Sequence, residues 1–393
     1  MFKKILVPNL PVILMIVLLF SANSALAVER LEKPDRPERP ERDAREETRV
    51  ISRNKIEIQK AISLGCVALK EVKTLNVLKC PKGVSDDLSL EEDIQVFAAD
   101  SGANTQIGAS TVSTSGNTGA GRKIVVLDTG YNYNHPELSS SYLGGKDFVN
   151  NDSDPFDDNG HGSHVAGIIT ADGIDPKAKG VAPDAGILAG KVLDTNGSGY
   201  FSDIVSAIYW AVDGPDGVYD SADDFKAEAI SLSLGTSYPY TYKRSYCNNV
   251  LPELTTAIKY AYDKGVVVVV AAGNEGTRGV SIPGCISYST TVGAVDKSDR
   301  VASFSGRGSA VDISAPGVNI FSSLLNSSYA SWNGTSMATP MVSGVVALIK
   351  SAHSTFTSSQ IETALFNTTK DLGRRGKDTD FGFGRVNAVG AVK

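Results

Sequence analysis

The chain has 393 residues, of which 41% are hydrophobic and 21% are charged, with 38 glycines and 16 prolines. This is the composition of an ordinary globular protein, and it excludes collagen-like, coiled-coil and wholly disordered chains. The formal net charge is −6, and residues 100–393 carry 22 basic and 29 acidic side chains. Because binding to nucleic acid phosphates needs a basic surface, we expect no nucleic acid partner. The acidic main body is compatible with the binding of hard cations.

The first 27 residues have the features of a secretory signal peptide. Lys3 and Lys4 precede an apolar run that ends at Phe20, and the small residues of Ala-Leu-Ala (25–27) follow it. The apolar run is short for a membrane span and is interrupted by two prolines and an asparagine, which makes an uncleaved anchor the less favoured alternative. We therefore expect export to the periplasm or the medium, removal of residues 1–27 and no membrane contact afterwards.

Two further segments precede the main body of the chain. Residues 28–50 carry 15 charged side chains of nearly balanced sign without hydrophobic periodicity, which predicts a disordered arm. Residues 51–99 have enough apolar patterning for a small module, with a helix expected at 56–64 and alternating residues at 67–77.

The four cysteines of an exported chain are expected to form disulfides. Three pairings are open from the sequence alone. We favour Cys66–Cys80 and Cys247–Cys285, because each pair then falls within one of the two regions, the small module or the main body.

From residue 100 the chain reads as a loop rich in Ser, Thr, Gly and Asn up to residue 122, and then alternates strands with helices. The expected strands are apolar runs at 123–127, 186–193, 229–234 and 265–272. The expected amphipathic helices lie at 202–212, 253–264, 336–352 and 359–368. Runs that are apolar on both faces are typical of a covered parallel sheet, so the pattern predicts a doubly wound α/β domain. Sites in such domains form at the carboxyl ends of the strands.

Three motifs lie where this rule predicts a site. Asp128 ends the first expected strand, His161 opens a helix within Asn-Gly-His-Gly-Ser-His (159–164), and Ser336 opens another helix within Gly-Thr-Ser-Met-Ala (334–338). Acyl transfer by a serine needs a base that takes the hydroxyl proton and an anion that orients this base. A helix N-terminus at Ser336 adds backbone N–H groups for a developing oxyanion.

Each motif alone is a weak signal, but the order Asp, His, Ser along the chain is one of the three orders known for this triad. With it, the chain resembles the subtilisin-like serine proteases, or subtilases, over residues 105–393, and most closely their secreted subtilisin and thermitase groups. The resemblance includes Gly-Ser-Gly (197–199), Ser-Leu-Ser-Leu-Gly (231–235) and Ala-Ala-Gly-Asn-Glu-Gly (271–276).

The resemblance implies a role for each matched position. Ser336 would be the nucleophile, His161 the general base, Asp128 the residue that orients it, and Asn274 the side-chain donor to the oxyanion. Two edges would hold the substrate as an added β-strand, which favours extended polypeptide of loosely defined sequence. These edges consist of Gly197, Ser198, Gly199, Ser231, Leu232, Ser233, Leu234 and Gly235.

His164 follows His161 by three residues, which raises the alternative of a metal pair. The zincin arrangement needs a spacing of four with a glutamate between, so we predict a packed structural residue beside the site. His135 and His353 stand in no motif of this kind, and we interpret them as ordinary histidines.

The position of residues 51–99 before the catalytic domain is that of the family's propeptide, which assists folding and inhibits the enzyme until self-cleavage. A large parallel sheet folds slowly, so early activity would destroy folding intermediates. We expect a zymogen that is cut near residues 98–100, with the propeptide as a transient inhibitor and residues 100–393 as the catalytic domain.

Acidic residues crowd two loops and suggest structural calcium, because spaced oxygens on flexible loops suit this ion. The resemblance to thermitase-like proteins implies a first site at Asp147, Asp152 and Asp154. A second cluster lies in an insertion and has no EF-hand spacing; it comprises Asp213, Asp216, Asp220 and Asp223. A third family site would pair Glu137 with the loop 172–178, whose sequence departs from the family's asparagine-rich pattern, and it stays open. For the first site, a solvated acidic loop is the alternative.

The sequence thus predicts a secreted, monomeric serine endopeptidase that acts on polypeptides. The rivals are a catalytically silent peptide-binding scaffold and a processing protease of narrow specificity. Basic-residue pockets need extra carboxylates near the specificity walls, and residues 231–235 offer none, so we expect broad specificity with an apolar or neutral preference.

Overall fold

The computed structural model describes residues 47–72, 75–88, 90–92 and 102–393. The described residues divide into two units: those from 47 to 92 belong to the smaller one and 102–393 to the larger one. The predicted signal peptide, most of the predicted arm and the predicted cleavage site lie outside the described residues. Within them, no helix combines the length and apolar character that crossing a bilayer requires.

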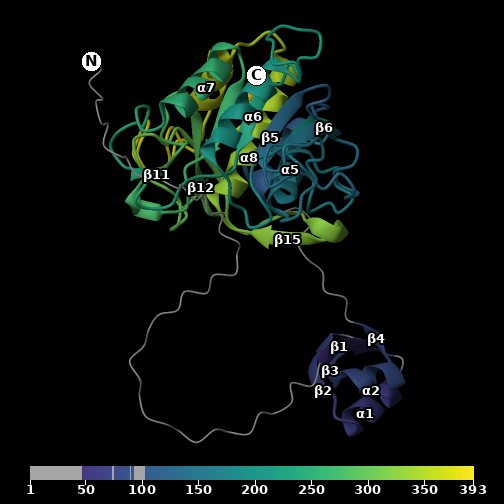
Figure 1. The fold of residues 1–393 in the computed structure, drawn as a ribbon. Helices are drawn as coiled ribbons and strands as arrows, with labels where there is room; N and C mark the ends of the chain where they lie inside the picture. The colour runs from purple at the N-terminus through teal and green to yellow at the C-terminus, as the bar shows by residue number, and fades with distance from the viewer. Residues whose placement is uncertain (1–46, 73–74, 89, 93–101) are drawn as a thin grey trace, which may run out of the picture. The chain divides into compact units, whose positions relative to one another are not determined.

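The smaller unit is a four-stranded antiparallel sheet in the order β2-β3-β1-β4 (Figure 1). Its elements are β1 (Glu47–Ser52), α1 (Lys55–Ser63), β2 (Val67–Val72), β3 (Leu75–Pro81), α2 (Lys82–Asp87) and β4 (Glu91–Glu92). β1 corrects the predicted arm, which was to run to residue 50: Glu47–Val50 is strand because it pairs with β3 and buries Val50. The predicted Cys66–Cys80 disulfide closes this small core.

The larger unit is built on a seven-stranded sheet in the order β13-β12-β10-β8-β5-β7-β6, and all its ladders are parallel. In sheet order the strands are β13 (Ile313–Pro316), β12 (Thr290–Val295), β10 (Val267–Ala271), β8 (Ala229–Leu232), β5 (Lys123–Asp128), β7 (Gly186–Lys191) and β6 (Tyr142–Asp147). The predicted α/β class is confirmed. The sequence analysis missed β6, β12 and β13, which are short or lack a long apolar run.

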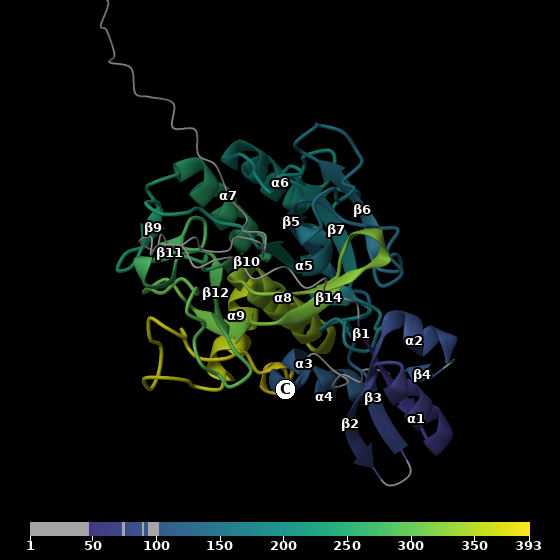
Figure 2. The ribbon, with the colours of Figure 1, turned by 90° about the horizontal axis from the view of Figure 1, so that it is seen from below.

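Helices cover both faces of this sheet (Figures 1 and 2). One face carries α5 (His161–Thr170) and α8 (Thr335–Ala352), and the other carries α6 (Phe201–Asp213) and α7 (Pro252–Asp263). The strands serve both cores by alternation: Val267 and Val269 pack into the core of α5 and α8, while Val268 and Val270 pack into the core of α6 and α7. This two-sided burial explains the uninterrupted apolar run.

The remaining elements are short or lie at the margins of the larger unit. They are α3 (Ala103–Gln106), α4 (Ala109–Thr114), β9 (Thr241–Tyr242), β11 (Val280–Ser281), β14 (Ile320–Ser323), β15 (Tyr329–Trp332), α9 (Ser358–Asn367), α10 (Ala388–Ala391), and the 3₁₀ turns Gly276–Arg278 and Leu325–Ser327. α3 and α4 correct the predicted loop at 100–122. They form there because Ile107 and Val112 are buried in the core beneath α8.

The topology brings distant segments to one edge of the sheet. The strands that follow β5 first extend the sheet through β7 and β6, and then, from β8 onward, extend it on the other side of β5. The order in which strands are added to the sheet reverses beside β5, and crevices form outside the carboxyl ends of strands at such a switch point. Asp128 is the last residue of β5 and therefore lies at this edge.

The predicted Cys247–Cys285 disulfide is also present, and both sulfurs are buried in the core beside α7. Replacing both residues by alanine is expected to lower the free energy of unfolding of the larger unit by about 4 kcal/mol. The bond closes a loop of 38 residues in the unfolded chain, and the entropy removed by a loop of this length gives that magnitude. Urea unfolding followed by tryptophan fluorescence measures it, since Trp210 and Trp332 both lie in the larger unit.

The double-alanine variant of Cys66 and Cys80 is the matched control. Its disulfide lies in the smaller unit, so the unfolding transition of the larger unit should not move. An unchanged transition in the Cys247/Cys285 variant would contradict the prediction.

Candidate active site

Asp128 and His161 form a buried hydrogen-bonded pair. Nδ1 of His161, the first residue of α5, lies 2.7 Å from Oδ1 of Asp128, whose side chain is fully buried. The backbone N–H of Thr129 donates to the same oxygen at 2.7 Å. Burial by itself lowers the pKa of the imidazole, but the Asp128 carboxylate raises it through its charge and its hydrogen bond, and the net pKa lies above the ordinary value. The imidazole is thus oriented by an anion and is basic for a buried histidine.

Ser336 lies in the first turn of α8 and is tied to the end of β8. Its hydroxyl donates to the carbonyl oxygen of Ser233 at 3.1 Å, and the hydroxyl of Ser233 donates to the carbonyl oxygen of Ser336 at 2.9 Å. That carbonyl is free because its helical partner would be the N–H of Pro340, which proline lacks.

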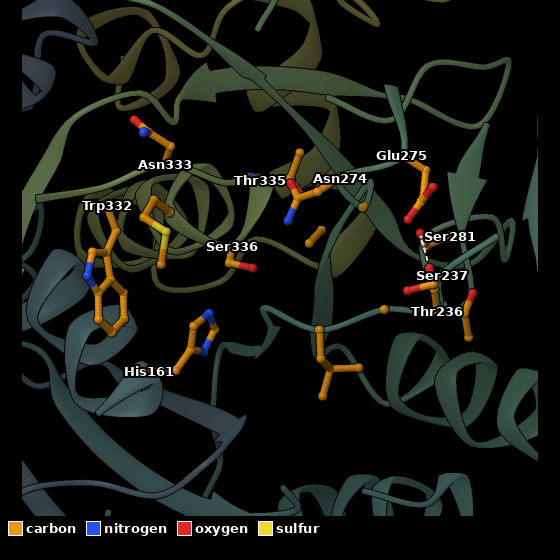
Figure 3. Close-up of a pocket in the computed structure, with 15 residues that line it drawn as sticks. His161, Thr236, Ser237, Asn274, Glu275, Ser281, Trp332, Asn333, Thr335 and Ser336 are labelled. Carbon is orange, nitrogen blue, oxygen red and sulfur yellow. Dashed lines mark hydrogen bonds between the residues drawn. The ribbon is translucent and has the colours of Figure 1, made fainter. Parts of the chain in front are cut away.

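His161 and Ser336 line the same cavity (Figure 3). In this rotamer the Ser336 hydroxyl is bonded to Ser233 rather than to the imidazole. Rotation about the Cα–Cβ bond of Ser336 redirects the hydroxyl without moving the helix. Of the predicted triad, the structure therefore joins two members by a hydrogen bond and brings the third to the same cavity.

Asn274 lies in the turn after β10 with its amide oriented by α8. Its Oδ1 accepts from the backbone N–H of Thr335 at 3.0 Å and from the Thr335 hydroxyl at 3.1 Å. With the acceptor end held in this way, the NH₂ group faces the cavity (Figure 3). The first N–H groups of a helix have no intrahelical partner, so the amide of Ser336 is a second donor at this place. Two donors thus converge next to the serine, as a developing oxyanion requires.

The predicted substrate edges differ in how they reach the cavity. Leu234 and Gly235 line it, and Ser233 is bonded to Ser336 at its margin. Ser231 and Leu232 are a correction: both are fully buried inside β8, with their backbones paired to β10, so they cannot contact a substrate. The segment 197–199 forms a turn closed by the bond from Asp194 N–H to the Ser198 carbonyl at 2.7 Å, and it does not line the cavity.

Two residues that the sequence analysis overlooked shape the cavity beyond Asn274 (Figure 3). The hydroxyl of Ser281 donates to the Thr236 carbonyl at 2.6 Å, so its side chain occupies that wall. Glu275 also lines the cavity, at 3.1 Å from Arg278. Residues 231–235 offer no carboxylate, as the sequence analysis stated, but Glu275 supplies one from the turn after β10. The sequence signal for this wall carboxylate was Glu275 itself, the residue directly after Asn274.

His164 is packed beside the site, as predicted. Its ring stacks on Trp332 with centroids 4.5 Å apart, and Nε2 lies 3.0 Å from the carbonyl oxygen of Ala330. Burial lowers its pKa to about 3, so the ring is neutral at ordinary pH. Trp332 also lies parallel to His161, with centroids 6.1 Å apart. His164 thus supports the wall that flanks the His161 imidazole.

The carboxylates of the first predicted calcium site do not converge. Asp147 is buried and accepts from the N–H groups of Val149 and Asn150 at 2.7 and 2.9 Å. Asp152 accepts from the N–H of Asp154, and Asp154 accepts from the hydroxyl of Tyr133 at 2.9 Å. Among the residues that the structure describes, no three His, Cys, Asp or Glu side chains lie close enough to share a cation. The three carboxylates of the first predicted site are thus not gathered around one point in this structure.

The second predicted cluster is likewise spread over separate hydrogen bonds. Asp213 accepts from the hydroxyl of Tyr260 at 2.6 Å, and Asp223 accepts from the N–H of Asp216 at 3.1 Å. The backbone N–H of Asp220 donates to Asp224 at 2.6 Å. The acidic insertion is thus organised by its own N–H groups.

The third calcium site, which the sequence analysis left open, has a different arrangement of hydrogen bonds. Glu137 is fully buried, and its carboxylate accepts from three successive N–H groups of the loop 173–175 at 2.6–3.0 Å and from the Tyr329 hydroxyl at 3.0 Å. Backbone donors occupy the carboxylate that would have to face a cation. The departure from the asparagine-rich pattern therefore coincides with a loop that binds Glu137 directly.

Comparison with known proteins assigns the family. Residues 119–384 match the subtilase family (Peptidase_S8). The chain is 42% identical over 274 residues to the thermophilic serine proteinase of Bacillus sp. (strain AK1). This match covers 70% of this chain and 62% of that protein. It is 41% identical over 276 residues to thermitase of Thermoactinomyces vulgaris, and 38% identical over 298 residues to subtilisin E of Bacillus subtilis (strain 168).

These matches cover 70% of this chain and 90% of thermitase, and 74% of this chain and 70% of subtilisin E. Of the AK1 proteinase the chain spans less than two thirds. The matched region contains the whole seven-stranded sheet from β5 to β13 and the cavity lined by His161, Asn274 and Ser336, with Asp128 hydrogen-bonded to His161. The chain therefore belongs to the subtilase family and is a subtilisin-like serine endopeptidase.

Proposed function

We propose that the chain hydrolyses peptide bonds through a triad of Asp128, His161 and Ser336. The observation that carries the proposal is the 2.7 Å pair of Asp128 and His161 beside a cavity that also holds Ser336 and Asn274. In the reaction, Ser336 Oγ attacks the scissile carbonyl while His161 takes its proton. Asp128 stabilises the imidazolium, and the donors of Asn274 and Ser336 N–H bind the oxyanion.

The second half of the reaction uses the same groups. His161 gives its proton to the leaving amine, which departs and leaves an acyl group on Ser336. Water then attacks the ester while His161 takes one of its protons. His161 passes this proton to Ser336 Oγ as the bond between Oγ and the acyl carbon breaks, which frees the serine and the carboxylic acid product. No cofactor is needed for either step.

The proposed substrate is extended polypeptide, bound as an added strand at the end of β8 next to the cavity. The chain around Leu234 and Gly235 supports this, because it has left the sheet and borders the cavity. Glu275 adds a negative charge to the wall, partly balanced by Arg278. We expect broad specificity for neutral and apolar residues, and Glu275 adds tolerance of basic ones.

The proposal includes export, action as a monomer and synthesis as a self-processed zymogen with residues 51–99 as the propeptide. Supporting features are the amino-terminal apolar run, two disulfides and a separate smaller unit before the catalytic one. Disulfides persist in oxidising compartments outside the cytosol.

The first test is hydrolysis of casein by the purified mature enzyme, blocked by a serine-directed phosphonate. Ser336→Ala should lower kcat by roughly 10⁶-fold, the scale that loss of the nucleophile has in the relative subtilisin. Ser343→Ala is the matched control, because this buried serine lies in the same helix and is bonded to Ser231 at 2.9 Å, outside the cavity. An inactive wild type that binds peptides would instead support the silent scaffold.

Self-processing predicts that full-length Ser336→Ala protein keeps residues 51–99 attached when it is exported from a host that lacks other proteases. The mutant has no nucleophile to cut the bond near residues 98–100. Intact mass and amino-terminal sequencing measure the outcome. Mutant protein that arrives already cut there would refute self-cleavage and point to a second protease.

Structural calcium is retained as a prediction from the carboxylate density of the loop 147–158. At free calcium about 100-fold above Kd, binding adds about 2.7 kcal/mol to stability. A chelator should therefore shorten the thermal inactivation half-life, and added calcium, but not magnesium, should restore it. Asp147→Asn should lose this sensitivity, whereas Asp216→Asn in the second cluster should keep it. An unchanged wild-type half-life would remove calcium from the description.

A further inference from the structure

Asp157 is a fully buried carboxylate four residues before His161. Its Oδ1 accepts from the Thr129 hydroxyl at 2.9 Å and from the N–H groups of Asn159 and Gly160 at 3.0 and 2.9 Å. Its Oδ2 accepts from the N–H and the hydroxyl of Ser163 at 2.8 and 2.6 Å. Five donors therefore fix the turn that leads into α5 and the first turn of the helix itself.

Thr129 connects this carboxylate to the loop after β5. Its hydroxyl donates to Asp157 and at the same time accepts from the backbone N–H of Gly162 at 2.8 Å. Its own backbone N–H donates to Asp128 at 2.7 Å. Thr129 thus connects Asp157 to Asp128, because its hydroxyl binds the first carboxylate and its backbone N–H binds the second. Asp157 is also bonded directly to the helix that begins with His161.

We propose that Asp157 is a positioning residue for the Asp128–His161 pair. It holds the start of α5 against Thr129, so that Nδ1 of His161 stays at hydrogen-bond distance from Asp128. This inference rests on the proposed triad but goes beyond it, since Asp157 neither lines the cavity nor contacts a reacting atom.

The chemistry of the site requires a carboxylate. All five partners act as donors, and only a group with two acceptor oxygens satisfies them together. An asparagine has one acceptor oxygen, and its NH₂ group would face two or three of the same donors. Buried N–H groups without an acceptor are costly, so Asp157→Asn should shift the turn rather than leave it in place.

The charge of Asp157 has a second consequence, which a purely structural residue would lack. The titratable groups that act on His161 are Asp128, Asp157 and the neutral His164. The negative charge of Asp157 adds to that of Asp128 in raising the pKa of His161. Removing it favours the neutral imidazole, so the pKa of His161 must fall, and the acid limb of the activity profile must move to lower pH.

The test measures kcat and KM against pH for a peptide substrate, with enzyme concentration fixed by phosphonate titration and calcium held constant. Asp157→Asn should lower kcat roughly 10- to 100-fold through misplacement of the imidazole, with KM nearly unchanged. The acid-limb midpoint of kcat/KM should fall by about half a pH unit or more. Thr129→Val keeps the charge and should lower kcat with a smaller shift of the midpoint, and Thr129→Ser should restore activity.

Asp312→Asn is the matched control. This carboxylate accepts from the N–H of Thr291 and pairs with Lys377 at 2.7 Å, next to the amino end of β13 and away from the cavity. It should lower the melting temperature without changing kcat or the midpoint.

Wild-type kcat and midpoint in Asp157→Asn overturn the positioning role. If that variant does not fold, wild-type kcat in Thr129→Val overturns it instead. Both results leave the proposed function intact as long as the wild-type enzyme hydrolyses the peptide and takes up the phosphonate. An inactive wild type overturns the proposed function and this inference with it.

Discussion

The hydrogen bond between buried Asp128 and Nδ1 of His161 is the interaction on which the rest of the site depends. Moving a carboxylate out of water is costly unless it is paired. Asp128 has two donors on Oδ1, while its Oδ2 has no partner among the described residues. Such an incompletely paired anion gains most when the imidazole beside it becomes charged. In the proposed reaction, that is the moment at which His161 has taken the serine proton.

The fold stabilises this pair because several rigid elements hold the two residues in place. β5 delivers Asp128 to the carboxyl edge of the sheet, and the turn at 157–160 delivers His161 as the first residue of α5. The buried ammonium of Lys191 donates to the carbonyl oxygens of Thr129 and Leu193 and to Asp158. One cation thus joins the loop after β5, the end of β7 and the turn before His161.

The candidate site could be located from the sequence because Asp128, His161 and Ser336 each stand in a local motif whose residue types suit acyl transfer, and Asn274 stands in another such motif. The long strands and helices could be predicted from two-sided or one-sided apolar periodicity. Ser231 and Leu232 were misassigned because a sequence does not reveal where a strand leaves its sheet. In β8, Ser231 is paired with both β5 and β10, and Leu232 is paired with β10. The sequence could not distinguish the role of Asp157 from that of the neighbouring aspartates, because only the folded turn directs five hydrogen-bond donors at this one carboxylate.

Pro340 is unfavourable inside α8, but a tertiary hydrogen bond compensates for it. Proline inside a helix normally costs about 3 kcal/mol, because an N–H is lost and the ring clashes with the preceding turn. Here the loss falls on the carbonyl of Ser336, and the hydroxyl of Ser233 replaces the missing donor. The bond to Ser336 is therefore made from the end of β8, the strand that also leads to Leu234 and Gly235 at the cavity. Ser233 thus holds both the backbone of Ser336, the proposed nucleophile, and the margin of the cavity, so the two cannot shift independently. In the proposed reaction, this coupling keeps a bound peptide strand in register with the Ser336 hydroxyl.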